Sequence, residues 1–143
     1  MSAQNRTLSI ILALAKLQTV VTRKFDANLS VHGLSFNDFI ILHYLSNAPG
    51  NKLRRIDLAE QMGITASGIT RTLAPLEKRG LVGREANEHD ARVSYVVLAP
   101  AGEELYNVSM KAAMYAANAV LPVSKTKKIV QLEELLLEIL SVS

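Results

Sequence analysis

Apolar residues recur at steps of three and four through the first part of the chain. The recurring positions are Ile10, Leu14, Leu17, Val21, Phe25 and Leu29. This spacing is that of the buried stripe of one long helix. The pattern therefore predicts a helix over residues 5–31 that stops around His32 and Gly33.

The pattern of apolar and polar residues over 56–81 predicts two short helices joined by a tight turn at Gly63. In the second helix, at about 100° per residue, Ile69, Leu73 and Leu76 fall on one stripe. Thr65 is placed to cap this helix and Gly80 to end it. The opposite face carries small polar and cationic side chains, namely Ser67, Arg71, Ala74 and Lys78.

Elements around this pair complete the outline. Ser35 predicts the N-cap of a helix with the sequence FNDFIILHYL, and residues 52–55 are a candidate short strand. Residues 81–85 and 93–98 favour strands and flank a polar, turn-prone stretch, which predicts a β-hairpin with an exposed tip. A helix is expected from Pro100 towards Val120, with a break at Pro122 and a last helix after Ser124.

The two ends of the chain are more apolar than one small domain can cover. Residues 8–14 are apolar nearly all round, and the last helix carries a broad leucine face. Helices of this kind need burial on most sides, so the sequence predicts packing against a second copy in a two-fold homodimer. The alternative is that both helices pack only on their own core.

Composition narrows the classes of function. The chain has 143 residues, 49% of them hydrophobic, with a net charge of +3 and no cysteine. This predicts a folded protein without disulfides or thiolate metal sites, and the mild basic excess permits a polyanionic partner without requiring one. Residues 6–15 faintly resemble a signal peptide, but the apolar stripe continues past Lys16. No run approaches a membrane span of about 18 residues, so a cytoplasmic protein without a membrane partner is expected.

Catalytic and metal chemistry are not predicted. His32, His43 and His89 lie in no metal-binding or nucleophile-activating spacing, and the chain has no phosphate-cradling glycine run. The adjacent pair Glu103 and Glu104 points apart on a helix. We therefore expect no enzyme activity, no catalytic residues, no metal site and no cofactor.

Helix, turn, helix and hairpin in this order are typical of a winged helix that binds double-stranded DNA. The second helix would enter the major groove with Thr65, Ala66 and Ser67 nearest the DNA. Thr70 can donate to a phosphate or a base, and the planar fork of Arg71 matches the two acceptors of a guanine. Phosphate contacts position the protein on the duplex without specifying a base sequence. The residues predicted to make them are Lys52, Arg54, Arg55, Lys78, Arg79 and Arg84.

The hairpin tip predicts a second contact with DNA. Arg92 can reach a narrow, A·T-rich minor groove, where negative potential is concentrated. Asp90 lies two residues away and can fix the direction of the guanidinium. From Lys52 to Arg92 the chain has eight basic and six acidic residues, so the prediction depends on their placement rather than on total charge.

The run LAEQMGITASGITRTLAPLEKRGLVGRE followed by HDARVSYVVLAPAGEEL resembles the MarR family of bacterial transcriptional regulators. Asp90-x-Arg92 matches the recurring D-x-R of that family, and Leu98-x-x-x-Gly102 matches the end of its signature. The resemblance implies a mainly α (α+β) fold in one domain over residues 1–143. The winged helix-turn-helix core would span residues 35–99, with dimerisation helices over 1–34 and 100–143.

The same resemblance implies a homodimer on a near-palindromic operator, usually a repressor, often relieved by a small-molecule effector. An effector pocket would be lined by Phe36, Phe39, His43 and Tyr44, for which core packing is the competing interpretation. The alternative function is a winged helix that serves as a protein-interaction module without specific DNA binding.

Three features depart from the family pattern. Ala99 stands where a capping threonine is common, and Pro75 lies inside the second helix, where it is expected to kink or strain the backbone. The third is a cluster of lysines at the start of the last helix, unfavourable to the helix dipole: Lys125, Lys127 and Lys128.

Overall fold

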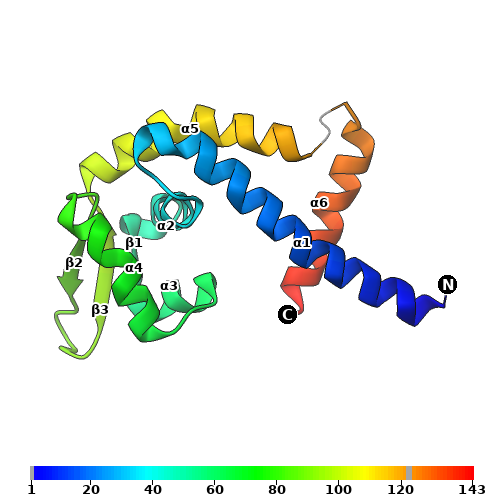
Figure 1. Ribbon diagram of the computed structural model, residues 1–143. Coiled ribbons are helices and arrows are strands. Elements are labelled where there is room, and N and C mark those ends of the chain that lie inside the picture. The colour runs from blue at the N-terminus through cyan, green and yellow to red at the C-terminus, as the bar shows by residue number, and fades with distance from the viewer. Residues whose placement is uncertain (1, 122–123) are drawn as a thin grey trace. The chain divides into compact units, whose positions relative to one another are not determined.

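The computed structural model describes residues 2–121 and 124–143. The chain forms two compact units, one from Leu29 to Met110 and one from the residues up to Asn28 together with those from Lys111 onward. The elements are labelled in Figure 1. The predicted break at Pro122 lies outside the described residues.

The unit from Leu29 to Met110 begins at the end of the first helix, α1 (Ala3–Leu29), which is followed by the short 3₁₀ helix η1 (Ser30–His32). Gly33 then adopts a left-handed conformation with φ 67°, and this conformation ends the helix where the sequence predicted. The next helix is α2 (Phe36–Ser46). The Ser35 hydroxyl accepts from the Asp38 N–H at 3.0 Å and the Asp38 carboxylate accepts from the Ser35 N–H at 2.9 Å, so the predicted N-cap is confirmed as a capping box.

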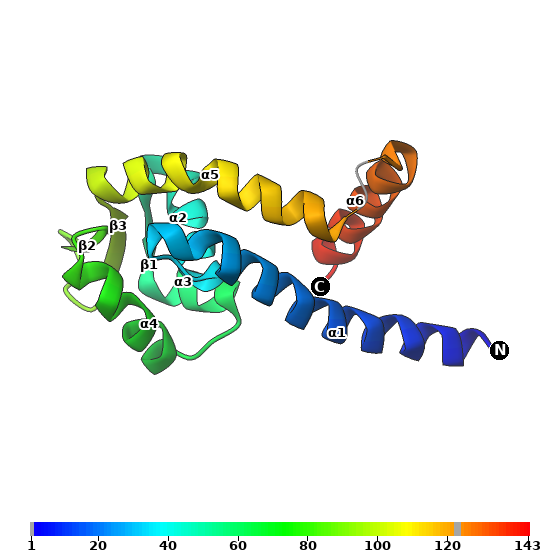
Figure 2. The ribbon, with the colours of Figure 1, turned by 45° about the horizontal axis from the view of Figure 1, so that its top comes forward.

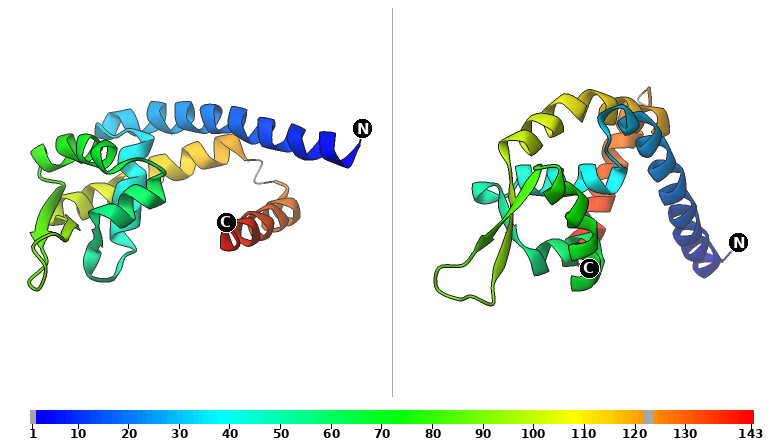
Figure 3. Two further views of the ribbon diagram at one scale, coloured as in Figure 1. Left: turned by 90° about the horizontal axis from the view of Figure 1, so that it is seen from below. Right: turned by 60° about the vertical axis from the view of Figure 1, so that its left-hand side comes forward.

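A three-stranded antiparallel sheet forms one side of this unit. Its strands are β1 (Lys52–Arg54), β2 (Val82–Ala86) and β3 (Ser94–Leu98), in the order β1-β3-β2. Tyr95 on the central strand pairs with Arg54 on one side and with Glu85 on the other. The hairpin and the short strand are therefore confirmed, and the connection between β2 and β3 projects away from the helices of the unit (Figure 3).

Between β1 and β2 lie α3 (Arg55–Met62) and α4 (Ala66–Lys78), which contact each other across a tight turn (Figure 2). The core beneath them consists of side chains from α2, α3, α4 and β3 that are almost inaccessible to solvent. Each buried leucine or isoleucine contributes roughly 2 kcal/mol through burial of apolar surface. The fully buried residues include Ile41, Leu42, Leu45, Leu58, Ile69, Leu73, Leu76 and Val96.

The start of α5 (Pro100–Val120) is fixed by backbone packing rather than by a side-chain cap. The Ala99 N–H donates to the Leu81 carbonyl at 3.0 Å. Gly102 is buried against the same carbonyl, and a Cβ atom at this position would collide with the Leu81 oxygen and approach the Leu98 side chain. The glycine of the sequence signature is therefore required because two backbone segments meet here.

The second unit contains most of α1, the later part of α5 and the helix α6 (Thr126–Ser141). Ala113 and Ala116 of α5 are buried. In contrast, α6 has no buried residue among those described, and its N-cap residue Lys125 makes no capping hydrogen bond through its side chain. No helix in the described part of the chain has the length and apolar character needed to cross a bilayer.

Candidate nucleic-acid interface

The turn between α3 and α4 determines how the second helix begins. Gly63 takes a left-handed conformation with φ 67° at the end of α3. The Thr65 hydroxyl accepts from the Gly68 N–H at 3.0 Å and is 3.1 Å from the Ser67 hydroxyl. The predicted cap is confirmed, and the exposed first turn of α4 is held by its own side chains.

The two faces of α4 are separated as the periodicity predicted. Ile69, Leu73 and Leu76 are at most 1% exposed. The helix is continuous through Pro75, although the Arg71 carbonyl there has no N–H from residue 75 to accept. The face turned to solvent carries Ser67, Arg71, Ala74 and Lys78, all of them exposed.

The eight basic residues between Lys52 and Arg92 divide into two groups. Five of them make ion pairs or hydrogen bonds within the protein: Lys52, Arg55, Arg79, Arg84 and Arg92. Arg54, Arg71 and Lys78 are exposed, and none of the three side chains has a hydrogen-bond or ion-pair partner among the described residues. These three cations are therefore the ones available to an external anion without breaking an internal contact.

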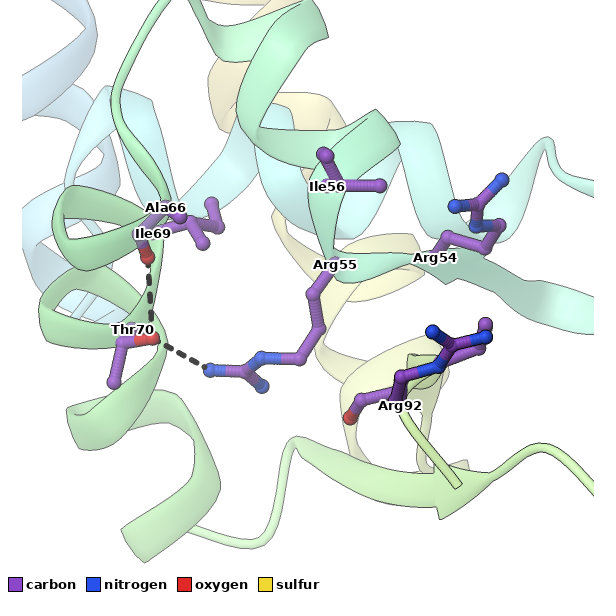
Figure 4. A pocket seen from close by; sticks show the side chains of 9 residues that line it. Arg54, Arg55, Ile56, Ala66, Ile69, Thr70 and Arg92 are labelled. Carbon is purple, nitrogen blue, oxygen red and sulfur yellow. Dashed lines mark hydrogen bonds between the residues drawn. The ribbon is translucent and has the colours of Figure 1, made fainter. Parts of the chain in front are cut away.

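Arg55 lies inward, in contrast to its predicted role as a phosphate contact. Its guanidinium donates to Glu77 Oε1 at 3.3 Å and to the Thr70 hydroxyl at 3.2 Å, and its side chain is only 14% exposed. Figure 4 shows the guanidinium reaching from the start of α3 to Thr70 on α4. Glu77 also accepts from Arg84 Nε on β2, at 3.1 Å through Oε2.

Thr70 is exposed, but its hydroxyl is already occupied. It donates to the Ala66 carbonyl at 3.2 Å while it accepts from Arg55 (Figure 4). The predicted donation from Thr70 to DNA would require the bond to Ala66 to be given up. Its methyl group is the part of the side chain that makes neither bond.

Arg79 connects the end of α4 to the turn after α1. Its two terminal nitrogens donate to the Gly33 carbonyl at 2.7 Å and to the His32 carbonyl at 3.3 Å. This fork satisfies carbonyls that a helix end and a turn leave unpaired. Arg79 was predicted as a phosphate contact, and here its donors are directed to the protein backbone.

The tip of the hairpin is organised by Asn87 and Asp90. The Asn87 side-chain oxygen accepts from the backbone N–H groups of His89 and Asp90, at 2.8 and 3.1 Å, which closes the loop as an Asx turn. Asp90 accepts from Arg92 through both carboxylate oxygens, at 3.1 and 3.3 Å. This hydrogen bond from Arg92 favours the charged form of the Asp90 carboxyl and lowers its pKa below the usual value.

The end of the hairpin next to its tip is braced across all three strands. Lys52 Nζ on β1 lies 2.8 Å from Glu85 Oε1 on β2 and 5.0 Å from the centre of the Tyr95 ring on β3. The Tyr95 hydroxyl accepts from the Asn87 amide at 3.1 Å. The hydrogen bond and the charge of Glu85 raise the pKa of Lys52. Sequence reasoning missed the parts of Tyr95 and Asn87, although Asn87 stood in a turn-prone stretch.

A concavity of about 310 Å³ lies between the starts of α3 and α4 and the strand that follows the hairpin tip. Arg54, Arg55 and Arg92 line it together with Ala66 and Thr70 (Figure 4). Of the three guanidinium groups around this hollow, those of Arg55 and Arg92 are paired with Glu77 and Asp90. The guanidinium of Arg54 is therefore the one that suits a phosphate or another anion. The structure thus brings the predicted residues Arg54, Ala66, Thr70 and Arg92 to one place.

Two of the four residues predicted to line an effector pocket, Phe39 and His43, lie against Tyr106. The Phe39 ring is 5.2 Å from the Tyr106 ring, and His43 Nδ1 shares a hydrogen bond of 2.7 Å with the Tyr106 hydroxyl. Phe39 and Tyr106 are buried, whereas His43 is exposed. Tyr44 lies 6.0 Å from His43 between ring centres. Within the described residues, no group of three or more His, Asp or Glu side chains is arranged to hold a metal ion.

Two short helices at a tight turn, a hairpin beside them and an exposed polar face on the second helix define a winged helix-turn-helix protein. Residues 32–93 match the family model described as MarR family. The solved structure of the transcriptional regulator BldR from Sulfolobus solfataricus is 26% identical, with a TM-score of 0.88 over 100% of both chains. The family model over residues 32–93 and the fold of the whole chain therefore agree, and the protein is similar to transcriptional regulators of the MarR family.

Two further solved structures share the fold at lower identity. A mutant MarR from E. coli complexed with operator DNA is 18% identical, covers 98% of this chain and 99% of its own, and has a TM-score of 0.81. CouR from Rhodococcus jostii bound to p-coumaroyl-CoA is 20% identical, covers 91% of this chain and 90% of its own, and has a TM-score of 0.80.

Proposed function

We propose that this protein is a sequence-specific double-stranded DNA-binding regulator that acts as a homodimer on a near-palindromic operator. The observation that carries the proposal is the exposed face of α4, where Arg71 and Lys78 have no partner among the described residues. A helix that buries one face and presents free donors on the other fits a major groove.

Each cation has a distinct part in this proposal. Arg71 reads a guanine, because its fork matches the two major-groove acceptors of that base. Lys78 and Arg54 contact phosphates and position the protein without specifying sequence. Arg92, held by Asp90, enters the neighbouring minor groove. The MarR structure from E. coli, which is complexed with operator DNA, supports the use of this fold on a duplex.

The proposed homodimer is supported by the apolar surface of the second unit. On α1, Leu8, Ile11 and Leu12 are 57–60% exposed. On α6, Leu137 and Leu140 are 59% and 68% exposed, and a groove of about 320 Å³ runs along its leucines. Exposed apolar surface on this scale marks an interaction site, and a second copy offers a surface of the same kind.

Repression, and relief by a small ligand, complete the proposal and rest on the family resemblance. CouR is bound to p-coumaroyl-CoA, which supports ligand binding by a protein of this fold. For this chain, the proposed position is around Phe36, Phe39, His43 and Tyr44, beside the Tyr106 ring.

The test is selection of bound fragments from random duplex DNA, followed by fluorescence anisotropy with the selected and with unselected duplexes. Selected DNA should bind at least about 10³-fold more tightly than unselected DNA. Binding should weaken as salt rises, because phosphate contacts release counterions. The control variant is Lys111→Ala, which removes one positive charge from the exposed surface of α5 and should change neither affinity. Equal, salt-independent binding to both duplexes would favour the protein-interaction module instead.

A further inference from the structure

Two adjacent arginines at the start of α3 have opposite environments. The Arg54 side chain is exposed and has no hydrogen-bond or ion-pair partner among the described residues. The Arg55 side chain is 14% exposed and has two partners on α4. From the sequence alone both arginines suit a phosphate contact, but the structure separates them.

The two partners of Arg55 lie far apart along α4. Thr70 and Glu77 are seven residues apart, about two helical turns, and one guanidinium contacts both. A guanidinium can do this because its donors form a rigid planar fork. The contact therefore restrains α4 along its length and about its axis, relative to the start of α3.

The electrostatics agree with an inward role. A cation at the start of a helix is unfavourable to the helix dipole, and Arg55 is the first residue of α3. The carboxylate of Glu77 compensates for this at 3.3 Å. Since the Glu77 side chain is only 23% exposed and also binds Arg84, a DNA phosphate would have to compete with a partly buried ion pair for Arg55.

We propose that Arg55 is a positioning residue for the recognition helix α4 and makes no phosphate contact of its own. This inference rests on the proposed function. Arg55 holds Thr70 and Glu77 so that the exposed face of α4, with Arg71, meets the base edges at a fixed depth and rotation. Loss of Arg55 reduces sequence discrimination, whereas loss of Arg54 reduces affinity for all DNA.

The first experiment compares Arg55→Met with Arg54→Met by the salt dependence of binding. Each lost phosphate contact reduces the slope of log affinity against log salt by about 0.9. Arg54→Met should show this reduction, and Arg55→Met should keep the wild-type slope. A reduced slope for Arg55→Met would overturn the inference.

The second readout is the ratio of operator affinity to random-DNA affinity. Arg55→Met should lower this ratio about fivefold, the scale expected for residues that act through a shared contact, while Arg54→Met should leave it unchanged. A merely destabilised protein would lose both affinities together. Arg55→Lys, which keeps a charge beside Glu77 but not the fork, should fall between wild type and Arg55→Met. An unchanged ratio for Arg55→Met would contradict the inference.

A third measurement separates this inference from the proposed function. If the wild-type protein shows no operator preference, the proposed function fails, but hydrogen exchange still reports on Arg55. Arg55→Met should reduce amide protection in the exposed turns of α4, and Arg54→Met should not. Equal protection in the two variants would refute positioning by Arg55, whatever the protein binds.

Discussion

Asp90 binds the Arg92 guanidinium through both carboxylate oxygens while the Arg92 side chain remains 91% exposed. An exposed arginine normally samples many rotamers, and fixing one costs conformational entropy. Here the direction of the side chain is set within the hairpin tip before any partner arrives.

Replacement of Arg92 by alanine should weaken operator binding most where the flanking sequence is A·T-rich. Narrow A·T-rich minor grooves concentrate negative potential, which an inserted guanidinium senses. Anisotropy titrations with operators that differ only in their flanks measure this effect. Equal losses on A·T-rich and G·C-rich flanks would count against minor-groove insertion.

The Asp90 carboxyl should titrate below the ordinary range of an aspartate, because the Arg92 hydrogen bond lowers its pKa. A pKa that is lower in the folded state stabilises the native pair at pH above the unfolded value. That contribution is lost as the pH falls through the lowered pKa. Carbonyl-detected NMR titration of the wild type and of Arg92→Gln tests this expectation. The pKa of Asp90 should be higher in the variant than in the wild type. An unchanged pKa in the variant would mean that Arg92 is not the cause.

Arg71→Ala should reduce operator discrimination by about 1–3 kcal/mol, the range for loss of a bidentate base contact. Lys78→Ala on the same face is the matched comparison. It should weaken operator and random DNA alike and reduce the salt slope. Unchanged operator affinity in Arg71→Ala would show that α4 does not read bases through this residue.

Gly102→Ala should destabilise the unit from Leu29 to Met110 by roughly 1–3 kcal/mol, as overpacking of a filled site does. The added Cβ would collide with the Leu81 carbonyl oxygen. Gly83→Ala on β2 is the control, since a Cβ there meets no atom within 4 Å. Thermal unfolding of both variants measures the difference, and equal midpoints would show that the backbone contact tolerates the methyl group.

Removal of α6 from Ser124 onward should disrupt the proposed homodimer. Sedimentation velocity measures the oligomeric state directly. Because a truncated chain can also fail to fold, Leu136→Lys with Leu140→Lys in the full chain provides a second test, and Glu134→Ala on the same helix provides the control. A stable dimer in both the truncated and the lysine variants would place the interface elsewhere.

The course of the backbone could be predicted closely from local patterns. The stripe of Ile69, Leu73 and Leu76, the caps at Ser35 and Thr65, and the helix start at Pro100 all depend on residues within a few positions of each other. These local features can be predicted from the sequence because they do not depend on distant parts of the chain.

The assignment of individual cations could not be predicted in the same way. Arg55 donates a hydrogen bond to Glu77, which lies 22 residues later in the chain, and Lys52 donates to Glu85, which lies 33 residues later. Long side chains reach partners that only the tertiary fold brings close. A helical wheel therefore shows the helix face from which such a side chain starts, but not the position of its charged group. The hydroxyl of Thr70 illustrates the same limit, since its donor capacity is used by a carbonyl one turn earlier.

The fork of Arg79 on the carbonyls of His32 and Gly33 has a consequence for natural variation in this protein. Gly33 takes φ 67°, and a Cβ there would lie 3.3 Å from Arg79 Nη2. A substitution at this turn would therefore alter the anchorage of the end of α4, although the turn lies 46 positions earlier in the chain than Arg79. Homologues that differ at position 33 are then expected to differ in target choice, even where every groove-facing residue is identical.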